Sequence, residues 1–291
     1  MASWSHADIF LRPAHFFMLS LSTLLIAASG YIINDYFDVK IDVINRPEKV
    51  IVERSINRRI AILWHSIFNA IGFLLAFILA KRLGIYQAML LQLTSTILLW
   101  FYSTHFKRQF VIGNLIVALL TALSILILAV YEPAIYPHVH FNFYLESEGK
   151  GYLNPFGVVL VYAFFAFMLT WMREVVKDME DFKGDAEDGC VTMPIKVGLK
   201  TSTRFVIALG IVALIPLILA GVKMLFGHWW VLGVYVLVFL VVPLIIWMRF
   251  LTQGARTEHY GKASKWLKII MVLGVFSLLI YYWVQFLVQA S

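Results

Sequence analysis

Long apolar stretches separated by short polar segments dominate the chain. Eight such stretches lie near residues 14–33, 60–80, 85–103, 111–131, 155–174, 204–222, 229–248 and 267–288. Each is close to the roughly 20 apolar residues that a helix needs to cross the hydrocarbon core of a bilayer. The pattern therefore predicts an all-α protein, a polytopic transmembrane helical bundle with eight spans.

The composition agrees with a membrane protein. Of 291 residues, 61% are hydrophobic and only 14% are charged, and the mean hydropathy is +0.83, which is too apolar for a soluble globular domain. The eight stretches use most of the chain, so we expect residues 1–291 to form a single membrane-embedded domain in contact with the lipid bilayer. A single cysteine excludes an intramolecular disulfide framework.

The net charge of +7 does not indicate a nucleic-acid partner, because such a bundle leaves no soluble face to present it. We expect no nucleic-acid partner, and we assign the positive charge to anionic headgroups or to an anionic substrate. The sequence does not indicate an oligomeric state.

The basic residues are distributed unevenly between the two ends of the predicted spans. If the eight stretches cross in turn, 19 of the 24 lysines and arginines fall on one side. The positive-inside rule places that side in the cytoplasm. We therefore expect an integral protein of the cell's inner (plasma) membrane, with its active site facing the cytoplasm.

The acidic residues indicate where this site lies. Ten of the 17 acids fall in two windows, residues 35–42 and 174–188, both at the cytoplasmic ends of spans. Asn34, Asp38 and Asp42 are four residues apart, so at about 100° per residue they share one helical face. A second stripe, at i, i+3 and i+7 with Glu174 one turn earlier, consists of Asp178, Asp181 and Asp185.

Two carboxylate stripes at a membrane boundary repel each other, and each acid costs about 2.5 to 3.5 kcal/mol deep in a bilayer. A cation must compensate. Oxygen ligands without histidine or thiolate suit a hard ion, and Mg²⁺ is usually held by a few carboxylates together with substrate phosphates. The residues thus predict a magnesium and diphosphate site, with countercharge available in nearby loops from Arg46, Lys107, Arg108 and Lys177. A solvated helix end would explain either stripe alone, but not two matched stripes on one side.

The sequence around both stripes resembles the UbiA superfamily of intramembrane prenyltransferases. The family's first aspartate-rich motif matches Asn34-Asp35-Tyr36-Phe37-Asp38-Val39-Lys40-Ile41-Asp42, followed by Asn45-Arg46-Pro47. The second matches Lys177-Asp178-Met179-Glu180-Asp181-Phe182-Lys183-Gly184-Asp185. Between the motifs, the family's loop after the central spans resembles Tyr102-Ser103 with Lys107-Arg108 and Asn114.

The resemblance implies Mg²⁺-dependent transfer of a polyprenyl group from an allylic polyprenyl diphosphate to a lipophilic acceptor. It implies metal ligation by Asn34, Asp38, Asp42, Asp181 and Asp185. It further implies catalytic roles for Lys107, Arg108 and Tyr102, with Tyr102 near the reacting carbon, and substrate-binding roles for Arg46, Lys177, Ser103, Asp35 and Asp178.

Two departures from the family pattern are visible. Family members have nine helices, whereas only 33 residues precede Asn34, enough for one span, so the family's first helix is expected to be missing. The run after Asn45-Arg46-Pro47 also differs from the Arg-Pro-Leu-Pro-Ser-Gly that is frequent in members acting on glycerol phosphate, since it continues Lys49-Val50-Ile51-Val52.

The acceptor is the least constrained part of the prediction. The first motif most resembles that of the family branch that acts on geranylgeranylglycerol phosphate, and an aromatic acceptor of the menaquinone or ubiquinone type is the alternative. An ion-coupled secondary transporter is the main alternative from another class, because intramembrane acids also mark ion paths. Transporter sites usually lie near the midplane of repeated halves, whereas these acids lie at helix ends. A CDP-alcohol phosphotransferase is disfavoured because Val39, rather than glycine, follows Asp38.

Overall fold

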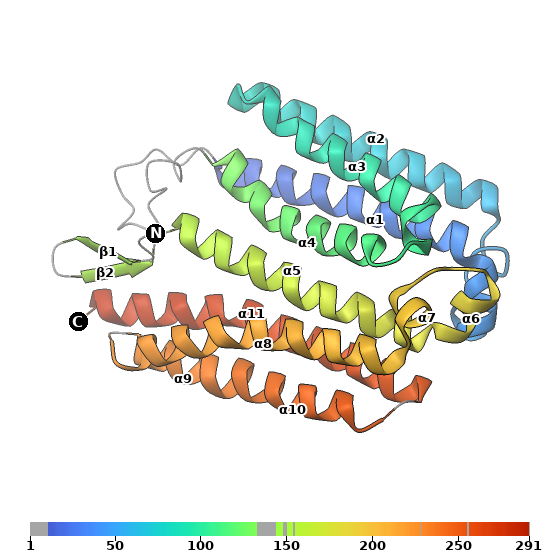
Figure 1. Ribbon diagram of the computed structural model, residues 1–291. Coiled ribbons are helices and arrows are strands. Elements are labelled where there is room, and N and C mark those ends of the chain that lie inside the picture. The colour runs from blue at the N-terminus through green and yellow to red at the C-terminus, as the bar shows by residue number, and fades with distance from the viewer. Residues whose placement is uncertain are drawn as a thin grey trace. The chain divides into compact units, whose positions relative to one another are not determined.

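The computed structural model describes residues 11–132, 144–147, 150–153, 155–227, 229–254 and 256–290. Helices account for almost all of its regular structure (Figure 1). The long ones are α1 (Pro13–Asn45), α2 (Arg58–Leu83), α3 (Met89–Thr104), α4 (Ile112–Tyr131), α5 (Pro155–Glu180), α8 (Leu199–Leu225), α10 (Val242–Thr252) and α11 (Thr257–Ala290). The short ones are η2 (Pro47–Lys49), η3 (Tyr86–Ala88), η4 (Phe106–Arg108), α6 (Phe182–Glu187), α7 (Met193–Val197), α9 (Trp230–Val236) and the π-helical η6 (Leu237–Val241).

The predicted all-α class is confirmed, with one small addition. Strands β1 (Tyr144–Ser147) and β2 (Lys150–Leu153) form an antiparallel hairpin in which Tyr144 faces Leu153. This hairpin lies in the segment between the apolar stretches near 111–131 and 155–174, and most of the remainder of that segment lies outside the described residues.

Seven helices of the described residues are long and apolar enough to cross a membrane, which makes this an integral membrane protein. They are α1, α2, α4, α5, α8, the continuous run α9–η6–α10, and α11. The prediction of eight spans is therefore approximate. The exception is the stretch near 85–103, where α3 has only 16 residues, about 24 Å at 1.5 Å per residue. The 3₁₀ turn η3, which precedes α3, extends it toward the thickness of the hydrocarbon core.

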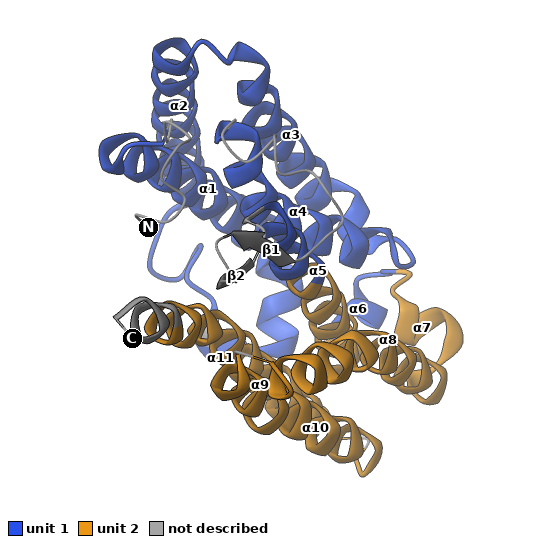
Figure 2. Cartoon of the chain, turned by 90° about the vertical axis from the view of Figure 1, so that its left-hand side faces the viewer, with its two compact units in different colours: residues 1–164, 183–190 blue, residues 165–182, 191–291 orange. Residues whose placement is uncertain are grey.

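The chain divides into two compact units (Figure 2). Unit 1 comprises residues 1–164 and 183–190, and unit 2 comprises residues 165–182 and 191–291. The chain passes from one unit to the other inside α5, again after the first residue of α6, and a third time after Cys190. The expected single domain stays a prediction.

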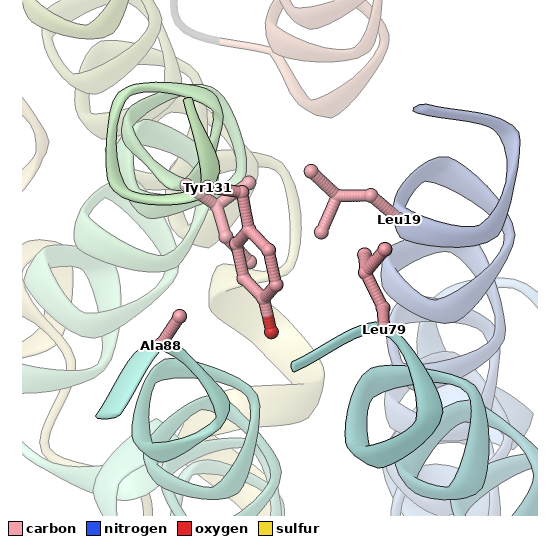
Figure 3. Packing of buried hydrophobic residues seen from close by; sticks show 5 residues of the cluster. Leu19, Leu79, Ala88 and Tyr131 are labelled. Atoms are coloured by element: carbon pink, nitrogen blue, oxygen red, sulfur yellow. The ribbon is translucent and has the colours of Figure 1, made fainter. Parts of the chain in front are cut away.

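In unit 1, α1 packs along α2 and α3, and α3 also contacts α4. A buried cluster of Leu19, Leu79, Ala88, Ile127 and Tyr131 joins the ends of these helices (Figure 3). Within it, the Tyr131 hydroxyl donates to Gln92 Oε1 at 3.2 Å, which satisfies a polar group that burial would otherwise penalise.

In unit 2, α8 packs on α9, and α10 and α9 pack on α11. Side-chain to backbone hydrogen bonds fix this packing. Trp247 Nε1 donates to the Ala263 carbonyl at 2.9 Å, and the Tyr235 hydroxyl donates to the Leu273 carbonyl at 2.8 Å. The π-helical turn η6 comes just before Pro243, whose missing N–H interrupts the regular hydrogen-bond ladder.

Candidate functional site

Helix α1 carries the first acidic stripe. It continues without a break to Asn45, so Asn34, Asp38 and Asp42 share one face, as their spacing predicts. Asp38 is only 4% exposed, and Asn34 Nδ2 donates to its Oδ2 at 2.6 Å. The other amide oxygen, Asn34 Oδ1, is buried and has no hydrogen-bond partner among the described residues. A buried oxygen left without a donor beside a carboxylate is suited to bind a cation.

Lys107 provides the counterion of Asp38. Its ammonium group lies at the start of the loop after α3 and forms an ion pair with Asp38 Oδ2. The turn η4 is held tightly against α4, since a Cβ on Gly113 would lie 2.8 Å from the Phe106 carbonyl oxygen. Val111, between the two, has φ of 62°, a strained value for a β-branched residue. The backbone therefore fixes Lys107 toward the face of α1 that carries Asp38.

The segment 183–190 also belongs to unit 1 and lies against the end of α1. The Gly184 amide donates to Asn45 Oδ1 at 2.9 Å. A Cβ on Gly184 would come within 2.6 Å of that same side chain, so only glycine permits this approach. Asp185, the next residue, is 5% exposed. The contact thus brings the last aspartate of the second motif to the helix that carries the first.

A second ion pair reinforces this arrangement. Arg108 Nη2 lies 2.9 Å from Asp188 Oδ2, which ties η4 to the turn after α6. Lys107 and Arg108 therefore contact acids from two different segments. Together these contacts place the acidic end of α1, the basic turn η4 and the segment 183–190 in one region of unit 1.

The pKa of the Cys190 thiol is shifted by its burial and by the charges in this region. Burial, together with the carboxylates of Asp185 and Asp188, raises the pKa of Cys190 to about 11, while Arg108 and Lys107 act in the opposite direction. The thiol is accordingly protonated at neutral pH and is not a nucleophile.

The first part of the second motif lies in unit 2. Glu174 is buried and forms an ion pair with the neighbouring Arg173. Lys177 and Asp178 occupy the last turn of α5, and the Asp181 amide donates to the Lys177 carbonyl at 2.8 Å. The prediction of one helical stripe through Asp178, Asp181 and Asp185 is wrong, because α5 ends at Glu180 and α6 begins at Phe182. Asp185 lies on a separate short helix that packs against Asn45.

The remaining predicted residues lie beside these elements. Tyr102 and Ser103 are in the last turn of α3, and the Ser103 hydroxyl donates to the Leu99 carbonyl at 3.0 Å. Arg46 caps the C-terminus of α1, with its amide donating to the Asp42 carbonyl at 2.8 Å. Asp35 is exposed.

Two residues that hold the region together, Asn45 and Asp188, were not assigned a role from the sequence. A signal for both was present. Asn45 lies 11 residues after Asn34, which returns it to the same face of α1, and Asp188 lies one turn after Asp185.

Among the described residues, no group of three or more histidine, cysteine or acidic side chains is close enough to hold a metal ion by itself. The oxygen donors that unit 1 does bring together, Asn34 Oδ1 and the Asp38 carboxylate, are of the type that Mg²⁺ prefers. They fit part of a magnesium site.

The sequence matches the model of the UbiA prenyltransferase family over residues 1–269. The chain belongs to the UbiA prenyltransferase family. It is therefore a prenyltransferase, and the family assignment decides for an enzyme over a secondary transporter.

Relatives within the family carry a more specific name. Digeranylgeranylglyceryl phosphate synthase of Methanosphaera stadtmanae is 30% identical over 260 residues, covering 89% of this chain and 84% of the relative. The enzyme of the same name from Thermococcus sibiricus is 29% identical over 268 residues, covering 90% and 83%.

Solved structures agree with the fold. A structure described as giving insights into digeranylgeranylglyceryl phosphate synthase in membranes has 26% identity and a TM-score of 0.61, covering 91% of this chain and 85% of that one. A UbiA homologue from Archaeoglobus fulgidus bound to DMAPP and Mg²⁺ has 15% identity and a TM-score of 0.54, covering 92% and 88%, which supports the fold alone.

Proposed function

We propose that this protein transfers a polyprenyl group from an allylic diphosphate to a lipophilic acceptor, and that the acceptor is geranylgeranylglyceryl phosphate. The observation that carries the proposal is the agreement with relatives named digeranylgeranylglyceryl phosphate synthase over at least 83% of their length. The acidic and basic residues gathered in unit 1 are of the kind that such a reaction needs.

The cofactor is Mg²⁺. The UbiA homologue of Archaeoglobus fulgidus binds Mg²⁺ together with a prenyl diphosphate, and the buried, unpartnered Asn34 Oδ1 beside Asp38 fits such an ion. When bound, the ion supplies positive charge that neutralises the diphosphate and stabilises it as a leaving group. The proposed ligands are Asn34, Asp38, Asp42, Asp181 and Asp185.

The chain's own cations complete the diphosphate site. Lys107 and Arg108 now pair with Asp38 and Asp188, and each has N–H donors that can turn to a phosphate oxygen. They stabilise the negative charge that develops on the diphosphate as its bond to the allylic carbon breaks. Arg46, Lys177, Ser103, Asp35 and Asp178 are the proposed further contacts to the substrate.

Carbon–oxygen bond formation then needs protection from water. The diphosphate leaves with the electron pair of the broken bond, and the acceptor hydroxyl oxygen attacks the allylic carbon and loses its proton. Water would compete for that carbon. Tyr102, in the last turn of α3, is proposed to lie near it and to shield the developing cation with its ring.

The orientation follows from the charges. We place the protein in the plasma membrane as one embedded domain, with the reaction at the cytoplasmic side. The distribution of lysines and arginines supports this, because 19 of 24 lie at the end that also carries both motifs.

The acceptor is tested by competition. Purified protein with Mg²⁺ and geranylgeranyl diphosphate is given geranylgeranylglyceryl phosphate and an aromatic acceptor of the menaquinone or ubiquinone type together, and products are identified by mass. We expect the ether-linked glyceryl phosphate product to dominate. A prenylated aromatic product as the major species would replace this acceptor while leaving the transfer reaction in place.

A further inference from the structure

Helix α1 contacts α2 through the face opposite to Asp38. The guanidinium carbon of Arg58 lies 5.3 Å from the centre of the Tyr36 ring, and His65 Nδ1 lies 3.0 Å from the Ser29 carbonyl oxygen. Tyr36 and Asp38 are two residues apart, which is about 200° around the helix. Helix α2 therefore covers the side of α1 that points away from the acidic stripe.

A cationic cavity lies at the start of α2. It has a volume of about 550 Å³ and is lined by Glu53, Asn57, Arg58, Arg59 and Ile60. Arg58 pairs with Glu53 at 2.5 Å, whereas Arg59 forms no ion pair or hydrogen bond within the described part of the chain. The Asn57 side chain does not cap the helix, so the first N–H groups of α2 also point toward this end. The cavity thus offers N–H donors to an anion that comes from outside the protein.

A second cavity lies farther along α2 from its N-terminus. It has a volume of about 250 Å³ and is lined by His65, Thr96, Ile97, Trp100 and Phe101. His65 follows Arg58 by two helical turns, about 10 Å along the axis and on the same face. Trp100 and Phe101 are 43% and 46% exposed, so their rings are accessible to a lipid chain. Thr96 Oγ1 is buried and has no partner among the described residues.

The first cavity offers donors for a phosphate, and the second is lined mainly by apolar side chains that suit lipid chains. We propose that the groove between α2 and α3 binds an anionic membrane lipid, with its phosphate at Arg59 and Arg58 and its chains along Trp100 and Phe101. Basic residues at a membrane surface are commonly general anchors. Arg58 and Arg59 differ from the basic pair Lys81 and Arg82 at the other end of α2 because a mainly apolar cavity lies next along the helix.

The lipid bound here is not the acceptor in the act of reaction. The groove lies on the Tyr36 side of α1, and the acceptor must reach the Asp38 side. Arg58 also contacts the ring of Tyr36, which is a residue of the first motif. A lipid bound at Arg58 therefore stabilises α1 on the face opposite to Asp38. The inference concerns lipid binding alone and does not depend on which acceptor is used.

The test uses quenching of Trp100 fluorescence by lipids brominated on their chains. The full-length protein is placed in phosphatidylcholine vesicles with increasing brominated phosphatidylglycerol or brominated phosphatidylcholine, without prenyl diphosphate. The difference between wild type and Trp100→Phe isolates the signal of Trp100. Arg58→Gln/Arg59→Gln is compared with the matched control Lys81→Gln/Arg82→Gln.

We expect the Trp100 signal to be half-quenched at a lower fraction of brominated phosphatidylglycerol than of brominated phosphatidylcholine. Arg58→Gln/Arg59→Gln should raise that fraction about thirtyfold, because the two basic residues near the surface contribute about 1 kcal/mol each. The control should leave it unchanged, and soluble glycerol 3-phosphate should not compete. Equal quenching by both lipids, equal effects of the two double variants, or displacement by glycerol 3-phosphate would each overturn the proposal. Prenyl transfer is measured separately, so its loss or retention does not affect this result.

Discussion

Asp38→Asn separates the catalytic role of the buried carboxylate from its structural role. Asp38 is 4% exposed and pairs with Lys107, whose side chain is 20% exposed. The substitution keeps the shape and the contact with Asn34 but removes the negative charge. Breaking a buried ion pair costs about 3 to 5 kcal/mol. Because the Lys107 ammonium can reach water along its flexible stem, we expect a smaller loss, about 2 kcal/mol of unfolding free energy.

A double variant sharpens this prediction. Lys107→Met in the Asp38→Asn background removes the unpaired ammonium, so the two substitutions should be non-additive by about 1 to 2 kcal/mol, and the double variant should recover much of the lost stability. It should not recover activity, since both a proposed metal ligand and a proposed diphosphate contact are then absent. We expect each variant to lose prenyl transfer by at least about 10²-fold.

The assays are thermal unfolding in detergent and product formation measured by mass under saturating Mg²⁺. Ser66→Ala, on the exposed side of α2, serves as a control and should change neither quantity. Near-native turnover by Asp38→Asn would refute the assignment of this carboxylate. Recovery of turnover in the double variant would show that the pair is structural only.

Three further predictions concern the same region. Gly184→Ala should lower the unfolding temperature and reduce the free energy of unfolding by about 1 to 3 kcal/mol, because the added Cβ would lie 2.6 Å from the Asn45 side chain. Combining it with Asn45→Ala should restore part of the lost stability. Additive effects of the two substitutions would contradict the contact. Arg108→Gln should change the free energy of unfolding by less than about 1 kcal/mol, since Arg108 is half exposed. The same substitution should reduce the rate of prenyl transfer tenfold or more. An unchanged rate would show that Arg108 is not part of the site. In the metal-free protein, alkylation of Cys190 by iodoacetamide should be slow at pH 8 and accelerate toward pH 11. The reason is that the raised pKa of about 11 keeps the thiol protonated at lower pH. A rate of alkylation that is already maximal at pH 8 would contradict the raised pKa.

Helical spacing allowed much of the region to be predicted where a single helix carries it. Asn34, Asp38 and Asp42 share a face because α1 is unbroken, and the i, i+4 rule needs nothing more. The second motif was predicted as one stripe because its spacing also suits a helix. The chain instead ends α5 at Glu180 and restarts at Phe182, so a helical wheel cannot place Asp185.

Contacts between distant segments explain the remaining differences. The close approach of Gly184 to Asn45 spans 139 residues, and no local pattern encodes it. Lys107 was predicted to be a cation of this region, but its contact with Asp38 depends on how η4 packs against α4. Likewise, the sequence predicts the extent of the apolar stretch near 85–103, but it does not predict where η3 ends and α3 begins.

The most direct test of the central claim is the dependence of prenyl transfer on Mg²⁺ in the purified wild-type protein. Geranylgeranyl diphosphate and geranylgeranylglyceryl phosphate are incubated with the protein after chelation, and the product is followed by mass as Mg²⁺ is restored. The account predicts no digeranylgeranylglyceryl phosphate in excess chelator and full recovery with Mg²⁺. Undiminished product in excess chelator would contradict it.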